Sequence, residues 1–131
     1  MSSIAVVDND VGILGMLTDL LEDGGWTVAT CADGEKAVAF LKDEQPDLVL
    51  LDLWLESPTS GWHVLRRLKL DPLTRDIPVV LLSEPGDPVQ TAEEWLQELG
   101  VAVLIKPFDV DLLYALVEEA LNDSTATPVA S

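Results

Sequence analysis

The sequence is poor in cysteine and in basic residues, and it contains no long hydrophobic run. Its one cysteine, Cys31, excludes an internal disulfide and a cysteine-based zinc site. No apolar stretch approaches the roughly 20 residues that a transmembrane helix needs. Residues 1–7 also lack the basic start of a signal peptide. We therefore expect a cytoplasmic protein with no membrane contact.

Positive charge is scarce along the whole chain. The sequence has 7 Lys and Arg against 24 Asp and Glu, so the formal net charge is 7 − 24 = −17. A surface of that sign repels the phosphate backbone of nucleic acids and anionic lipid headgroups, so direct binding to either is not expected. Glycine-rich loops of the GxGxxG type or of the GxxxxGK type are absent, and nucleotide binding therefore has no support.

The length and composition favour one folded domain. The chain has 131 residues, and 48% of them are hydrophobic, which is enough to fill a core and excludes global disorder. We expect the domain to span residues 1–122. A flexible tail, residues 123–131, should follow it.

Five short apolar runs alternate with segments of helical periodicity. The runs lie at residues 4–7, 26–31, 48–51, 77–82 and 101–105. Several are almost continuous Val, Leu and Ile, which is typical of strands covered by helices on both faces. The alternation predicts an α/β fold, a doubly wound five-stranded parallel sheet with five helices and right-handed crossovers.

Helix start and stop residues bound the five predicted helices. Aspartates in the N-cap position, a proline in the first helical position and glycines just past the end are the main signals. The helices are expected after Asp10, over residues 34–44, after Gly61, from Asp87 to Gly100, and from Asp109 to Asn122.

Polar residues follow the apolar runs at the points where the predicted strands end. Open parallel sheets bind ligands at the carboxyl ends of their strands, so these positions form the candidate site. They collect carboxylates, one amide, one hydroxyl and one ammonium group, from Asp8, Asn9, Asp10, Asp52, Ser83, Glu84 and Lys106.

These groups together suit a phosphoryl group. Carboxylates at adjacent strand ends repel one another unless a cation lies between them, and Mg²⁺ prefers such oxygen ligands. Lys106 adds a fixed positive charge, and Ser83 adds a hydrogen-bond donor. Cations would neutralise the phosphoryl oxygens while a carboxylate accepts the group.

Four segments, taken in order, resemble the response-regulator receiver family. The resemblance covers residues from about 4 to 122, and each segment ends a predicted strand. It implies a flavodoxin-like sheet of order 2-1-3-4-5 and phosphotransfer from a histidine kinase or phosphotransfer protein. The segments are Val6-Val7-Asp8-Asn9-Asp10, residues 46–52, residues 77–83 and Ile105-Lys106-Pro107-Phe108.

The resemblance also implies a role for each candidate residue. Asp52 would accept the phosphoryl group, Ser83 and Lys106 would contact its oxygens, and the Lys106–Pro107 peptide would be cis. The domain would act in a two-component system as a phosphorylation-controlled interaction switch. Its face of helix 4, strand 5 and helix 5 would contact a target protein or a second copy. The Mg²⁺ ligands would be Asp8, Asn9, Asp52 and the backbone carbonyl of Trp54.

The sequence departs from the family pattern at four places, one of which is the segment from residue 54 to 60 before a late Gly61, and the other three support a second hypothesis. Asn9 stands in place of an acidic metal ligand, Glu84 in place of a small residue, and Val103 in place of an aromatic residue that reports phosphorylation. The lost charge should weaken Mg²⁺ binding, and a carboxylate at position 84 would repel a phosphoryl group. The chain could therefore be a pseudo-receiver, a binding module with impaired phosphorylation.

Local and enzymatic interpretations also remain open. Asp8, Asn9 and Asp10 could serve only to cap the first helix, and Ser83 could make only a local turn hydrogen bond. A haloacid-dehalogenase-like phosphatase would use Asp8 as nucleophile and Asp10 as general acid, but it leaves Asp52 unexplained. A receiver is expected to turn over no substrate beyond its own phosphotransfer and autodephosphorylation.

Overall fold

The structure, a computed structural model, describes residues 2–53, 55, 60–85, 96, 98–107 and 109–125, with side chains described through residue 122. Most of the helix predicted between Asp87 and Gly100 lies outside these residues, so no helix is labelled α4. The described elements are β1 (Ser3–Val7), α1 (Val11–Asp23), β2 (Thr27–Cys31), α2 (Gly34–Glu44), β3 (Leu48–Asp52), α3 (Ser60–Leu70), β4 (Val79–Ser83), β5 (Val101–Ile105) and α5 (Val110–Thr125).

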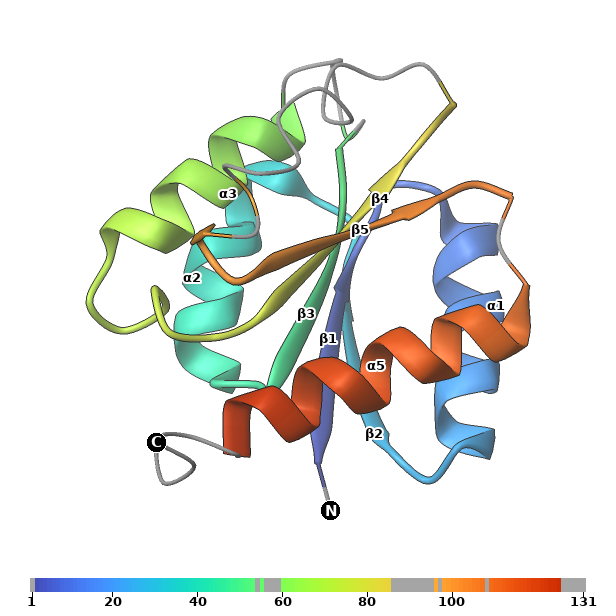
Figure 1. The fold of residues 1–131 in the computed structure, drawn as a ribbon. Helices are drawn as coiled ribbons and strands as arrows, with labels where there is room; N and C mark the ends of the chain where they lie inside the picture. Colours follow the sequence, from blue (N-terminus) through green and yellow to red (C-terminus); the bar gives the residue numbers. More distant parts are fainter. Residues whose placement is uncertain are drawn as a thin grey trace.

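The five strands form one parallel sheet in the order β2-β1-β3-β4-β5 (Figure 1). This order confirms the predicted 2-1-3-4-5 sheet. Near the carboxyl ends, Asp52 of β3 pairs with Leu82 of β4, and Ser83 pairs with Ile105 of β5. The residues that follow the strands therefore emerge along one edge of the sheet.

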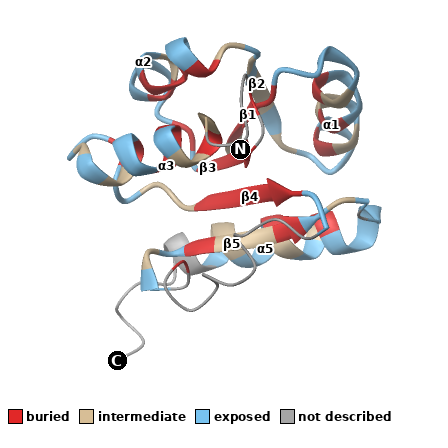
Figure 2. Cartoon of the chain, turned by 90° about the horizontal axis from the view of Figure 1, so that it is seen from above, coloured by how far each residue is buried: buried red, intermediate tan, exposed pale blue. Residues whose placement is uncertain are grey.

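Helices cover both faces of the sheet. Figure 1 shows α2 and α3 on one face and α1 and α5 on the other. Neighbouring residues of β3 belong to opposite clusters, because Leu51 packs with α2 and α3 whereas Leu50 packs with α1 and α5. Seen along the sheet edge, the central strands are buried between the helices (Figure 2). Burial on both faces explains their continuous apolar sequences.

Several element ends differ from the prediction. β4 begins at Val79 and not at residue 77, because Pro78 has no N–H for the sheet and the Ile77 N–H donates to the Thr74 carbonyl in a turn. β3 and β4 each run one residue further than the apolar runs and thus include Asp52 and Ser83. These two candidate residues are therefore part of the sheet.

The last helix is also longer than predicted. α5 extends through Thr125, past the expected end at Asn122. The sequence from 110 to 125 contains no glycine or proline, and the first proline after it is Pro128. The expected tail therefore contributes its first residues to α5, and residues 126–131 lie outside the described part.

α3 begins at Ser60 and contains Gly61, whereas the sequence predicts a start after Gly61. A Cβ atom at position 61 would lie 2.4 Å from the backbone oxygen of Asp52 and 2.4 Å from Cα of Leu53. The Gly61 N–H donates to the Leu53 carbonyl over 3.0 Å. The glycine is required because the helix start packs directly on the end of β3.

We expect Gly61→Ala to lower the free energy of unfolding by about 3 kcal/mol, because the added methyl meets backbone that cannot yield. The matched control is Gly15→Ala in α1, where a Cβ meets no atom within 4 Å. That change should raise stability by about 0.5–1 kcal/mol through helix propensity. Urea unfolding followed by circular dichroism measures both. Equal effects of the two changes would contradict the packing argument.

Candidate functional site

Asp8 follows β1 and is completely buried. Its N–H donates to the Cys31 carbonyl over 3.1 Å, and its Oδ1 accepts from the Asp10 N–H over 2.9 Å. The other oxygen, Oδ2, is buried without a hydrogen-bond partner among the described residues. Nζ of Lys106 lies 3.8 Å from it. A buried carboxylate oxygen in this position is suited to a cation.

Asp52 is the last residue of β3 and is 6% exposed. Its Oδ1 accepts from Nζ of Lys106 over 3.5 Å. The backbone N–H of Lys106 donates to the Ser83 carbonyl over 2.7 Å, which holds the lysine at the end of β5. The sheet therefore brings Asp8, Asp52 and Lys106 together, as the strand-end argument predicts. The Lys106–Pro107 peptide is cis, as the resemblance implies.

Ser83 lies at the end of β4, one residue past the partner of Asp52 in the sheet. Its side chain is buried, and its hydroxyl donates to the Glu84 carbonyl over 3.1 Å. This is the local turn hydrogen bond that the sequence left open. The position of Ser83 at the same sheet edge is compatible with a phosphoryl contact, which stays a prediction.

Glu84 adds a carboxylate to this edge. Its side chain is 57% exposed, but its Oε1 lies 4.0 Å from Nζ of Lys106. Lys106 thus lies within 4.0 Å of three carboxylates, those of Asp8, Asp52 and Glu84. With all four groups ionised, their formal charge is 1 − 3 = −2. A divalent cation would balance it.

The residues present fit Mg²⁺ in part. Asp8 and Asp52 supply carboxylate oxygens, and the buried Oδ2 of Asp8, which accepts no hydrogen bond from the described residues, is suited to ligate a cation. In the described part of the chain, no group of three or more His, Cys, Asp or Glu is arranged to hold a metal. Mg²⁺ accepts backbone oxygens and water as further ligands. Trp54, whose carbonyl is a predicted ligand, lies outside the described residues.

Asn9 points its amide at the segment after β3. Its Nδ2 donates to the backbone carbonyl of Leu55 over 2.6 Å. The Leu55 N–H in turn donates to the hydroxyl of Ser60 over 3.0 Å. The sequence argument did not single out Leu55 or Ser60. One signal was present, since Leu55 is an apolar residue in a short and mostly polar segment.

The contacts of Asp10 and Val103 bear on the phosphatase and pseudo-receiver hypotheses. Oδ1 of Asp10 accepts from the N–H groups of Gly12 and Ile13, so its side chain caps α1. This engagement counts against Asp10 as the general acid of a phosphatase. Val103 is half-buried in the edge strand β5 and packs against the cluster under α2 and α3.

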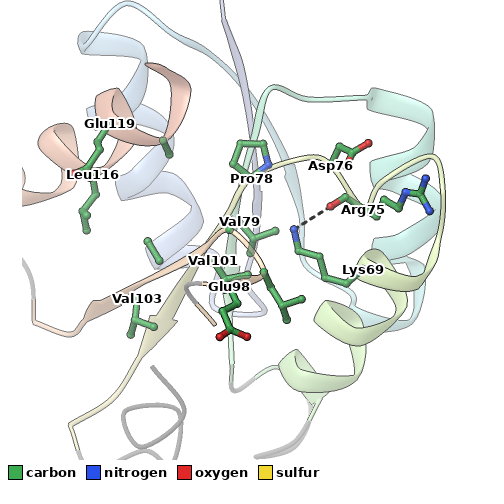
Figure 3. Close-up of a pocket in the computed structure, with 14 residues that line it drawn as sticks. Lys69, Arg75, Asp76, Pro78, Val79, Glu98, Val101, Val103, Leu116 and Glu119 are labelled. Carbon is green, nitrogen blue, oxygen red and sulfur yellow. Dashed lines mark hydrogen bonds between the residues drawn. The ribbon is translucent and has the colours of Figure 1, made fainter. Parts of the chain in front are cut away.

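A separate cavity of about 720 Å³ lies at the opposite end of the strands, near the first residues of β4 and β5 (Figure 3). Lys69 borders it, and its Nζ donates to the carbonyls of Arg75 and Ile77 over 3.1 and 3.2 Å. Burial lowers the pKa of this lysine. Asp8, Asp52 and Lys106 do not line the cavity. The candidate site is a charged cluster at the other edge of the sheet.

A parallel α/β sheet with an acidic cluster and a lysine at its carboxyl edge is compatible with more than one class of protein, and comparison with known proteins assigns the class. A family model described as the response regulator receiver domain matches residues 4–118. The chain belongs to this family.

Individual relatives support the assignment. RpaA of Synechocystis sp., a DNA-binding dual master transcriptional regulator, is 34% identical over 131 residues, which is 100% of this chain and 54% of RpaA. The receiver domain of NtrX from Brucella abortus has a TM-score of 0.78 and 33% identity, and the match covers 91% of this chain and 98% of that one. The signal receiver domain of a Syntrophus aciditrophicus histidine kinase has a TM-score of 0.83 and 28% identity, over 98% of this chain and 96% of that one. The chain spans about half the length of RpaA.

We expect Glu84→Ala to speed phosphorylation of the domain by acetyl phosphate up to about fivefold. The change removes one negative charge and one competitor for Lys106, and an exposed ion pair is worth about 0–1 kcal/mol. Glu44→Ala, at the far end of α2, is the matched control because it makes the same change in net charge. Intact mass spectrometry over time measures both rates. A slower reaction of Glu84→Ala would show that Glu84 assists the site.

Proposed function

We propose that this domain accepts a phosphoryl group on Asp52, with Mg²⁺, and thereby controls a partner protein. The observation that carries the proposal is the 3.5 Å contact between Nζ of Lys106 and Oδ1 of Asp52, beside the buried carboxylate of Asp8. Three segments distant in the sequence supply these groups. A phosphoryl group attached to Asp52 would therefore lie next to the ammonium group of Lys106, which the fold already holds in place.

The transfer follows from the chemistry of these groups. A carboxylate oxygen of Asp52 attacks the phosphorus of a phosphohistidine, and the bond from phosphorus to the imidazole nitrogen breaks. Asp8 and Asp52 would hold Mg²⁺, which supplies positive charge to the phosphoryl oxygens when bound. Lys106 would exchange its contact with the Asp52 carboxylate for one with the phosphoryl group. The hydroxyl of Ser83 would rotate from the Glu84 carbonyl toward the new anion.

The proposed partners are proteins. Members of the receiver family interact with histidine kinases and with downstream effectors. The net charge of −17 argues against nucleic acid as a direct ligand of this domain. No helix in the described part of the chain is long and apolar enough to cross a membrane. A cytoplasmic location, and a contact face or dimer formed by helix 4, β5 and α5, stay predictions.

A pseudo-receiver is the second candidate function. Two contacts favour it, the hydrogen bond from the Asn9 amide to the Leu55 carbonyl and the approach of Glu84 to Lys106. The first fixes the orientation of a side chain that, as a neutral amide, attracts Mg²⁺ less than a carboxylate would. The second places a competing anion beside the phosphoryl position. In that case the domain would bind its partner without being phosphorylated.

Incubation with acetyl phosphate and Mg²⁺ separates the two functions. We expect one phosphoryl adduct by intact mass, lost in Asp52→Asn and in excess EDTA, because the carboxylate is the acceptor and the cation balances its charge. Asp47→Asn, at the opposite end of the same strand, should keep the adduct. An unmodified wild-type mass with an intact fold would favour the pseudo-receiver.

Hydrolysis of p-nitrophenyl phosphate tests the phosphatase hypothesis. We expect no turnover above background from the wild-type domain, because Asp10 is engaged in capping α1. Robust activity that is abolished by Asp8→Asn and retained by Asp52→Asn would overturn the proposed assignment of the acceptor.

A further inference from the structure

Asn9 connects two segments that meet at the acidic edge. It follows Asp8 at the end of β1, and its Nδ2 reaches the carbonyl of Leu55, three residues past Asp52. The two atoms are 2.6 Å apart, which is short for a hydrogen bond between an amide and a carbonyl. A direct bond therefore spans the gap between the end of β1 and the segment after β3.

This hydrogen bond requires a donor at position 9, which the Asn9 amide supplies and an ionised carboxylate cannot. The Leu55 carbonyl needs a donor, and an ionised aspartate at position 9 would have only acceptors. Two acceptors can face each other only with a cation or water between them. Asparagine, in contrast, joins the same two segments without a metal. The replacement of an acidic residue by Asn9 thus changes what holds this part of the site together.

Leu55, one of the described residues between β3 and α3, is held by three contacts. Its side chain is 1% exposed and belongs to the core cluster under α2 and α3. Its N–H donates to the hydroxyl of Ser60, the first residue of α3. The Asn9 amide satisfies its carbonyl. The side chain of Leu55 is therefore packed in the core, and its backbone N–H and carbonyl are both hydrogen-bonded.

The same region contains the tight contact of α3 with β3. The Gly61 N–H donates to the Leu53 carbonyl, directly after the proposed acceptor Asp52. Hydrogen bonds thus link Leu55 to Ser60 and Gly61 to Leu53, and the Asn9 amide links Leu55 to the end of β1. The Leu53 N–H is also held by the Leu82 carbonyl of β4, so loss of the Asn9 hydrogen bond should loosen Leu55 and the start of α3 first.

We propose that Asn9 is a positioning residue, a metal-independent clamp that holds Leu55 and, through it, the start of α3 in place before any cation binds. The consequence for Mg²⁺ rests on the proposed function; the clamp itself does not. Asn9 would make the metal-free site more ordered and the Mg²⁺ affinity lower, because a neutral amide attracts the cation less than a carboxylate does.

Amide hydrogen exchange in EDTA tests the clamp. NMR would follow the amides of Leu55 and Gly61 in the wild type, Asn9→Ala and Asn9→Asp. Both changes remove the donor, so we expect these two amides to exchange about tenfold faster in each variant. Gln45→Ala is the matched control, since it also removes an amide that donates to a backbone carbonyl, that of Leu73. It should leave Leu55 and Gly61 unchanged.

Calorimetric titration with MgCl₂ separates the clamp from a general loss of stability. We expect Asn9→Asp to bind Mg²⁺ about tenfold more tightly than the wild type, and to recover the slow exchange of Leu55 and Gly61 when Mg²⁺ is present. Asn9→Ala should recover neither property. The two variants lack the same hydrogen bond but would differ in Mg²⁺ affinity and in the recovery of slow exchange. A general loss of stability would not produce that difference.

Unchanged exchange of Leu55 and Gly61 in Asn9→Ala under EDTA would overturn the clamp. Mg²⁺ binding by Asn9→Asp that is no tighter than that of the wild type would overturn only the inferred effect of Asn9 on the metal. No phosphoryl donor is present in these experiments. Failure of Asp52 to accept a phosphoryl group would therefore refute the proposed function and leave the clamp result standing.

Discussion

The contact of the Lys106 amine with the carboxylates of Asp8 and Asp52 is the interaction on which the site depends. Asp8 is completely buried and Asp52 nearly so, and two such charges on adjacent strands repel each other. Lys106 lies 3.8 Å from one and 3.5 Å from the other. It comes from the edge strand β5, which is separated from β3 by β4. The parallel sheet is therefore what makes the arrangement possible, since it aligns the carboxyl ends of these strands.

Two side chains beside this ion pair depart from the pattern that the receiver resemblance implies. Asn9, in place of an acidic residue, donates a hydrogen bond to the Leu55 carbonyl, while Glu84 places another carboxylate within 4.0 Å of Lys106. The first change lowers the negative charge at the end of β1, and the second adds negative charge at the end of β4. The acidic character of the edge is thus kept, but its distribution is shifted toward β4 and β5.

Most of the fold followed from periodicity and from residues with one strong local preference. The apolar runs predicted all five strands, because strands buried on both faces must be apolar throughout. Asp10 and Asp109 predicted helix starts, since their carboxylates accept from N–H groups of the first turn. The predicted ends of helices and strands were less accurate where a contact with a neighbouring element determines the end. β4 starts late because of the turn at Ile77, and α3 starts early because Ser60 and Gly61 pack against β3.

The sequence by itself determined which groups stand at the strand ends, because that depends only on where each apolar run stops. It could not decide what those groups touch. The Asn9 amide contacts Leu55, the Ser83 hydroxyl contacts the Glu84 carbonyl, and Glu84 turns toward Lys106. The Ser83 contact is local and was one of two open interpretations. The contacts of Asn9 and Glu84 join residues that follow different strands, whose distance and direction are set by the register of the sheet and by the close approach of α3 to β3. Only the tertiary structure contains that information.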